Sequence, residues 1–253
     1  MLDLSKDPRP KILIATPHAG SCLWVFHQST IEIYRKTNPE TALIYDRGCQ
    51  GSNIAENQNS LCDMARDNGM DYIFFVETDM GFPGEALMML LSHKKDIVGA
   101  TYPYKDHDLL ARNLADEKAN LRYMGRELDL SPITFRSLVE GEAVRKVDFV
   151  PMGCTLISMA AIERVMDYRT SQCNPPLPEG VRSAPFRHVE AILPDYKRPA
   201  VSTTDSTFCS DARAAGLDVW LDARLSLMVE HHGLASYGML PHTWAPPEML
   251  EQP

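Results

Sequence analysis

The sequence has 253 residues, of which 44% are hydrophobic and 23% charged, as expected for a globular protein that buries a substantial core. The formal net charge of -9 argues against broad electrostatic attraction to nucleic acid or anionic membranes, while leaving room for a local basic groove. The six cysteines contain no C-x-x-C pair, which argues against a cysteine-based zinc site and favours free thiols in a reducing compartment.

The N-terminal residues and the apolar runs do not indicate export or membrane insertion. The N-terminal residues lack the basic start and apolar stretch of a signal peptide. No apolar run approaches the length that a membrane span needs. We therefore expect a cytoplasmic protein without a membrane span.

The first part of the chain alternates apolar runs with segments of helical periodicity. Strands are predicted at 11–17, 41–45, 72–76 and 96–100, and helices at 20–36, 53–68 and 85–93. Gly69 is well placed to end the second helix. This rhythm indicates an α/β fold with a doubly wound, largely parallel sheet flanked by helices.

The rhythm breaks between Tyr102 and Arg145, where we expect an inserted hairpin and loop region. Segments 134–139 and 144–150 are predicted to pair as this hairpin. Further along, strands are predicted at 154–159, 219–222 and 225–229, and helices at 160–169 and 205–215. Segment 171–198, with five prolines, is predicted to be a long irregular loop that closes as a lid over a substrate.

The run Tyr72–Val76 is apolar throughout and stops at two acidic residues, Glu77 and Asp79. In an extended chain, residues two apart project to the same side. Neighbouring carboxylates repel unless a cation or a shared proton holds them. Both residues follow the C-terminal end of the predicted strand, and ligands of open α/β sheets bind at the edge where such strand ends lie. The pattern predicts a divalent metal and the phosphates it would carry, with ordinary loop carboxylates as the alternative.

Other candidates lie far from this pair in the sequence. His231 follows a predicted strand and could add an imidazole, a mixture that suits manganese, although a surface histidine is the alternative. Asp205 precedes a helix and is either its N-cap or a general base. Asp46 and Asn57 become candidates if this edge binds a nucleotide. Walker A, G-x-G-x-x-G, G-x-S-x-G and H-E-x-x-H motifs are absent, which removes several α/β enzyme classes.

Taken in order, these pieces resemble the GT-A fold glycosyltransferases, especially the short family 2-like enzymes of phage and bacteria. The matching segments are 15–17, 55–57, 71–83, 96–103, 150–157, 204–209 with 215–216, and 231–233. The resemblance implies a single Rossmann-like GT-A domain over residues 1–253. It divides into a nucleotide-sugar-binding half at about 10–103, an acceptor and catalytic half at about 104–240, and a flexible tail at 241–253.

The resemblance also implies roles for individual residues. Glu77-Thr78-Asp79 stands where the family has its D-x-D motif, with Asp79 as the preferred direct metal ligand. His231 matches the late histidine that completes such a metal site, together with Glu77. Asp205 matches the catalytic base of inverting members.

The donor-binding positions implied by the resemblance come from several segments. The nucleotide would be held at Thr16, Pro17, Asp46 and Asn57, while Glu77 and Asp79 would face the donor diphosphate. Gly153 falls in the turn beside the donor sugar and the acceptor.

The resemblance implies a metal-dependent, inverting hexosyl- or pentosyltransferase of a bacterial or phage-infected cell. It would use Mn²⁺ or Mg²⁺ and a UDP-linked sugar, and its hydroxyl acceptor would be a modified DNA base, a glycan or another molecule. One alternative is a nucleotidyltransferase, which needs a basic residue near the first strand, where Lys11 lies at the wrong end. A non-catalytic nucleotide-sugar-binding module is the other.

Overall fold

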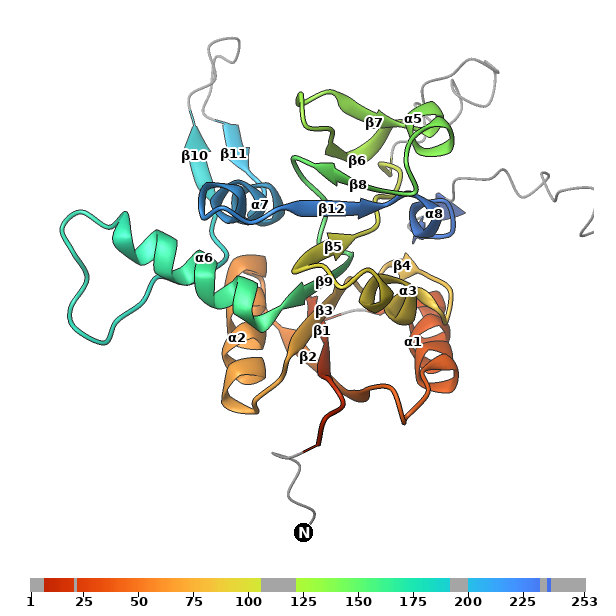
Figure 1. Ribbon diagram of the computed structural model, residues 1–253, viewed down its shortest axis with the longest axis horizontal. Helices are drawn as coiled ribbons and strands as arrows, with labels where there is room; N and C mark the ends of the chain where they lie inside the picture. The colour runs from red at the N-terminus through yellow and green to blue at the C-terminus, as the bar shows by residue number, and fades with distance from the viewer. Residues whose placement is uncertain (1–6, 21, 106–121, 192–199, 233–235, 238–253) are drawn as a thin grey trace, which may run out of the picture.

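The computed structural model describes residues 7–20, 22–105, 122–191, 200–232 and 236–237. The strands of its central sheet are β1 (Lys11–His18), β2 (Leu43–Gln50), β3 (Tyr72–Val76), β5 (Ile97–Gly99), β8 (Val144–Val147), β9 (Cys154–Ser158) and β12 (Val219–Asp222). They form a seven-stranded sheet in the order β2-β1-β3-β9-β5-β12-β8 (Figure 1).

The sheet is mixed, whereas the sequence predicted a largely parallel one. Parallel pairs join β1 to β2, β1 to β3, and β5 to β12. Strand β9 runs antiparallel to both β3 and β5, and β8 runs antiparallel to β12. A strand buried on both faces has the same apolar pattern in either direction, so the sequence could not reveal that β9 is reversed.

Helices cover both faces of the sheet (Figure 1). On one side lie α2 (Ile54–Asp67), α6 (Met159–Ser171) and α7 (Thr204–Ala214), and on the other α1 (Trp24–Lys36), α3 (Ala86–Ser92) and α8 (Ala223–Ser226). Along β3, Ile73 and Phe75 pack into the first core, while Phe74 and Val76 pack into the second. All four side chains have zero exposure, which confirms a strand buried on both faces.

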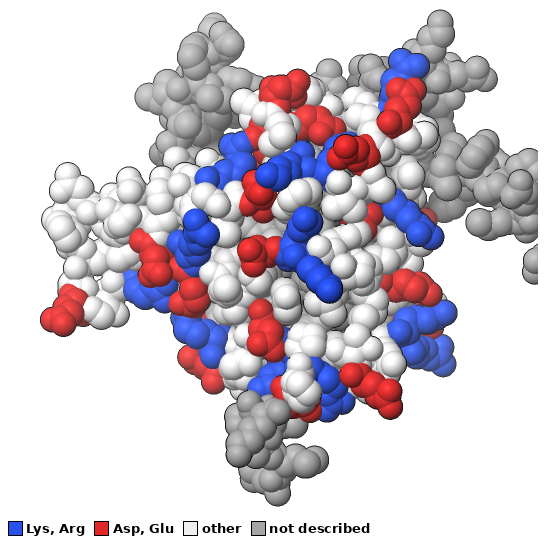
Figure 2. All heavy atoms as spheres, viewed as in Figure 1, with Lys and Arg blue, Asp and Glu red and all other residues white. Residues whose placement is uncertain are grey.

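Charged side chains of both signs share the surface. On the face drawn in Figure 2, lysine and arginine are interspersed with aspartate and glutamate, so this face carries no broad basic patch. Among the described residues, no helix is both long and apolar enough to cross a membrane.

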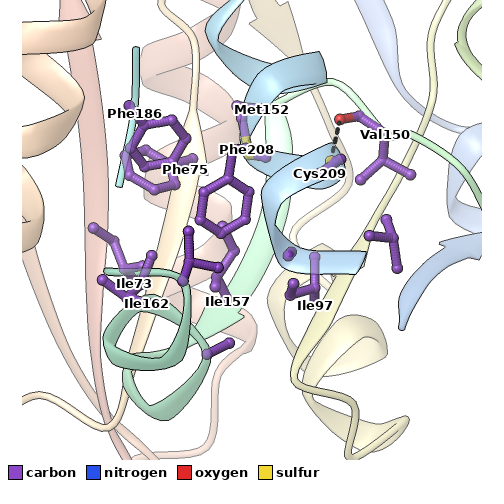
Figure 3. Close-up of a cluster of buried hydrophobic side chains, with 14 of the residues drawn as sticks. Ile73, Phe75, Ile97, Val150, Met152, Ile157, Ile162, Phe186, Phe208 and Cys209 are labelled. Carbon is purple, nitrogen blue, oxygen red and sulfur yellow. Dashed lines mark hydrogen bonds between the residues drawn. The ribbon is translucent and has the colours of Figure 1, made fainter. Parts of the chain in front are cut away.

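Aromatic side chains anchor the segment that follows α6 (Figure 3). Phe186 stacks on Phe208 with ring centroids 4.7 Å apart, and it meets Phe75 edge-on at 5.3 Å. The Asn59 side chain bonds both backbone groups of Phe186, at 2.9 and 3.0 Å. The predicted lid is therefore fixed to the core at Phe186. A short hairpin of β10 (Val189–Ala191) and β11 (Ala200–Ser202) follows, and residues 192–199 lie outside the described part.

The hairpin predicted at 134–150 is wrong. Phe135–Glu140 forms a helix, α5, and β8 joins the edge of the central sheet. A capping box explains the helix, because Thr134 and Ser137 each bond the other's backbone N–H. The inserted region does contain a hairpin, but its strands are β6 (Arg122–Arg126) and β7 (Pro132–Thr134).

The strand predicted at 225–229 is also wrong. Asp222 caps α8 by accepting a hydrogen bond from the Leu225 N–H at 2.7 Å, so the chain turns helical there. The strand comes later, as β13 (Glu230–His232), and lies between β4 (Met80–Gly81) and β14 (Ser236–Tyr237). The predicted tail at 241–253 lies outside the described residues.

Candidate active site

The small sheet of β4 and β13 brings His231 beside the acidic pair. In its register His231 lies opposite Met80, and the N–H of His232 donates to the Asp79 carbonyl at 2.7 Å. His231 Nε2 is consequently 3.8 Å from Asp79 Oδ2. One ligand atom each from Glu77, Asp79 and His231 lies within 4.8 Å of the others. The structure thus assembles the three predicted metal ligands.

The hydrogen bond on the far side of the His231 ring determines what the ring presents to Asp79. Nδ1 lies 3.1 Å from the Pro103 carbonyl, which can only accept, so we assign the proton to Nδ1. Burial, together with nearby Lys105, lowers the pKa of His231 and favours the neutral ring. Nε2 therefore turns a lone pair toward the Asp79 carboxylate, while Nδ1–H donates to a backbone carbonyl, as is usual in metal-binding histidines.

Only one of the two carboxylate oxygens of Asp79 has a polar partner within the described residues. Its Oδ1 is buried without a hydrogen-bond partner, while Oδ2 forms an ion pair with Lys105 Nζ. Two carboxylates and an imidazole lone pair converge on one point, and this donor set suits a borderline divalent ion such as Mn²⁺. The residues present fit a divalent metal.

Glu77 is held by a relay through Tyr102 and Gly153. The Gly153 N–H donates to the Tyr102 hydroxyl at 3.0 Å, and that hydroxyl bonds the Glu77 carboxylate. A Cβ on residue 153 would lie 2.3 Å from the Tyr102 hydroxyl, so only glycine leaves room for the ring. Desolvation, with the charges of Asp205 and Asp79, raises the pKa of Glu77 to about 8. These carboxylates are close enough to repel strongly.

Asp205 is not the N-cap of α7, because Thr203 caps that helix. Asp205 is 8% exposed, and its side chain turns inward. Its Oδ2 accepts from the Met152 N–H at 3.1 Å, and its Oδ1 accepts from Thr204 Oγ1 at 3.0 Å and Gln58 Nε2 at 3.4 Å. Burial raises its pKa. A carboxylate offers roughly four acceptor positions, so these bonds orient Asp205 while leaving it capacity to take a proton.

Asn57 supports the edge of the sheet from α2. The residue is 4% exposed, and its Nδ2 donates to the Gly51 carbonyl at 3.0 Å and the His18 carbonyl at 3.4 Å. Asn57 thereby ties the end of β1 to the residue that follows β2. Asn57 therefore holds the ends of these two strands together.

The other donor-binding candidates occupy different places. Thr16 and Pro17 are buried and continue β1 past Ala15, which lies opposite Phe75, toward the edge that carries the acidic pair. Asp46 does not end its strand as predicted, because β2 continues to Gln50. The exposed Asp46 lies opposite Ile14, and contacts of the described residues do not connect it with the metal-ligand cluster.

Sequence reasoning missed Tyr102, Lys105 and Gln58 as site residues. A buried glutamine on the apolar face of an amphipathic helix was the available signal for Gln58, which has zero exposure. Tyr102 follows a predicted strand and could have been suspected from that position. Lys105 stands among interspersed charges of both signs and offered no signal.

Comparison with known proteins bears on the fold. No protein-family model matches the chain, and no curated protein matches its sequence. Among solved structures, the chain is similar to A197 from STIV, with a TM-score of 0.50 and 14% identity over 94% of this chain and 97% of that one. The two chains share a fold. This likeness extends over nearly their whole lengths and concerns architecture, because fold alone does not establish activity.

Proposed function

We propose that this protein is a metal-dependent glycosyltransferase that moves a sugar from a nucleotide-sugar to a hydroxyl acceptor. The observation that carries the proposal is the convergence of Glu77, Asp79 and His231 beside the C-terminal end of β3. Ligands of α/β sheets bind at such edges. The GT-A-like order of the sequence segments and the fold shared with A197 from STIV support this assignment.

Asp79 and His231, with Glu77, would hold Mn²⁺ or Mg²⁺. When bound, such an ion supplies positive charge that stabilises the diphosphate leaving group. Lys105, now paired with Asp79, lies where its ammonium group could contact the same phosphates. Thr16, Pro17 and Asn57 would shape the pocket for the nucleotide of a UDP-sugar, whereas Asp46, which lies within β2 opposite Ile14, has no part in this proposal.

Asp205 would act as general base. Its carboxylate would take the proton of the acceptor hydroxyl as that oxygen attacks the anomeric carbon, and the nucleoside diphosphate would leave from the opposite face, which inverts the configuration. A raised pKa makes Asp205 a stronger base, and its hydrogen bonds to Met152, Thr204 and Gln58 hold it in one orientation. Gly153, whose carbonyl accepts from the Glu77 N–H, would lie beside the donor sugar with its backbone, because the Tyr102 ring fills the space of a side chain at this position.

Donor turnover tests this assignment. The purified protein is incubated with a panel of nucleotide-sugars and Mn²⁺, and nucleoside diphosphate release and Mn²⁺ binding are measured. We expect Asp79→Ala to abolish both, while Asp67→Ala, which removes an exposed carboxylate at the end of α2, retains both. Full transfer by the Asp79→Ala variant would contradict the metal role.

The same assay separates the two alternatives. Lys11 begins β1, at the opposite edge from Glu77, but Lys105 supplies the basic group that a nucleotidyltransferase would need. Pyrophosphate release from nucleoside triphosphates would therefore favour that enzyme class. Thermal stabilisation by a nucleotide-sugar with Mn²⁺ but without turnover would favour a binding module.

The acceptor is tested separately. A hydroxylated DNA base or a glycan could each supply the hydroxyl, and the face in Figure 2 offers no broad basic patch for DNA. Mass spectrometry of nucleosides from DNA after co-expression decides between them: a glycosylated base identifies DNA as acceptor, and unmodified bases count against it.

A further inference from the structure

A second polar site lies between the end of α6, the segment after it, and α7. It is a cavity of about 280 Å³, lined mainly by polar side chains. Arg169 enters it from the last turn of α6, Arg187 from the following segment, and Asp211 from α7. None of these residues contributes to the candidate active site, so the cavity is a separate site.

The charges in this cavity do not balance. Arg187 Nη2 lies 3.2 Å from both carboxylate oxygens of Asp211, and Arg169 Nε lies 3.4 Å from Asp211 Oδ2. Asp211 is the sole acidic residue among the described residues that line the cavity. Two guanidinium groups thus share one carboxylate, which leaves a net positive charge.

Arg169 also has donors to spare. Its side chain is 13% exposed, and both Nε and Nη1 are buried without a hydrogen-bond partner. Burial and the nearby Arg187 lower the pKa of Arg169, as expected for two cations held close together. Buried charged donors that lack acceptors destabilise a fold, so the two unbonded donors of Arg169 mark a place where a bound acceptor would stabilise the protein.

Another hydrogen-bond donor beside the cavity could bind a ligand that carries several hydrogen-bond acceptors. Ser183 Oγ lies 3.2 Å from Cys173 Sγ and can turn its hydroxyl inward. The Arg169 carbonyl is already occupied, because it accepts from the Gln172 N–H at 3.1 Å and from Cys173 Sγ at 3.4 Å. Among the described residues, the unbonded Nε and Nη1 groups of Arg169 find no hydrogen-bond acceptor, so a bound molecule could supply one.

We propose that this cavity binds an oxyanion, a phosphate or carboxylate group carried by a small molecule. Planar guanidinium forks match the paired oxygens of such groups and form strong charge-assisted hydrogen bonds with them. The volume of about 280 Å³ leaves room for such a group together with part of the small molecule that carries it, since pockets for whole drug-sized ligands begin at roughly 300 Å³. This site is separate from the residues of the proposed transfer reaction, and the proposal does not depend on that reaction.

Isothermal titration calorimetry with inorganic phosphate and with acetate, at constant ionic strength and without metal, tests the site. We expect the wild-type protein to bind one or both, phosphate if the cavity takes a dianion and acetate if it takes a carboxylate. Arg187→Met should weaken binding by about tenfold or more, because it removes one guanidinium and leaves Asp211 to neutralise Arg169. Arg169→Met should have the same effect.

Two control variants locate the binding. Arg136→Met removes an exposed cation on α5 that pairs with Glu140, and it should leave affinity unchanged. Lys105→Met should also retain binding, because Lys105 belongs to the other site. No binding of either anion by the wild-type protein, equal binding by Arg187→Met, or loss of binding in Lys105→Met would each overturn the proposal.

Discussion

His231 Nε2 lies 3.8 Å from Asp79 Oδ2, while Nδ1 of the same ring bonds the Pro103 carbonyl. The neutral ring therefore points a lone pair at a carboxylate, and two electron-rich groups face each other. Such a pairing is unfavourable unless a cation lies between them. Lys105 supplies one positive charge at Asp79, and this relationship leads to the first prediction.

Replacing Lys105 with methionine should tighten Mn²⁺ binding in the absence of donor. The ammonium group pairs with Asp79 and competes with any other cation for its oxygens. Because both side chains are about one-third exposed, we expect a modest gain, on the order of threefold to tenfold in Kd. Electron paramagnetic resonance of free Mn²⁺ measures it. Lys146→Met, which removes an exposed lysine paired with Asp218, is the control, and an unchanged Kd in Lys105→Met would argue against competition.

Tyr102→Phe should destabilise the fold by about 1–2 kcal/mol, because the Gly153 N–H loses its buried acceptor. The pKa of Glu77 should rise further in this variant, since the Tyr102 hydroxyl bond lowers it. Urea unfolding and Mn²⁺ titration across pH measure the two effects. Metal binding should then need a higher pH than in the wild type.

Tyr123→Phe is a matched control for that experiment. Tyr123 has zero exposure, and its hydroxyl has no hydrogen-bond partner. Its removal should leave stability equal or higher. Equal destabilisation in the two variants would show that the Tyr102 hydroxyl makes no special contribution.

Glu77→Gln should stabilise the metal-free protein in a pH-dependent manner. The pKa of Glu77 is raised from 4.5 to about 8, so the folded state favours the protonated form. Its contribution to stability is complete below pH 4.5 and declines as the pH rises toward 8. Glutamine mimics the protonated side chain and escapes this loss.

The difference in melting temperature between variant and wild type, measured in a chelating buffer, should therefore be near zero at pH 4.5 and grow toward pH 8. Added Mn²⁺ should stabilise the wild type more than the variant, because the ion offsets the repulsion only where the carboxylate is present. A difference that is constant with pH would refute the assignment of a raised pKa.

Asp205→Asn should reduce kcat by about 10² to 10⁴ if Asp205 is the general base, with little change in donor affinity. Steady-state kinetics with saturating donor measure it. Thr203→Ala provides the structural control, because it removes the true cap of α7 and should lower stability by about 1 kcal/mol while retaining turnover. Undiminished kcat in Asp205→Asn would remove Asp205 from the mechanism.

Local patterns predicted the elements whose signals lie within a few residues. The helix after β2 begins and ends as expected, because Asn53 caps it through two backbone N–H groups and Gly69 adopts a φ of 60° just beyond it. The apolar pattern at 134–150 predicts a hairpin, but the capping box of Thr134 starts a helix there. The pattern at 225–229 predicts a strand, but Asp222 caps a helix just before it.

The sequence by itself determined that a buried strand ends on two carboxylates, and it pointed to His231 and Asp205 as partners. Only the tertiary structure decided how these groups meet: the pairing of β13 with β4 that places His231 beside Asp79, the hydroxyl of Tyr102 on Glu77, and the ammonium of Lys105 on Asp79. Local periodicity and composition indicate which side chains are buried and where helices begin and end. Contacts between distant segments depend on how whole layers pack, and no local pattern specifies them.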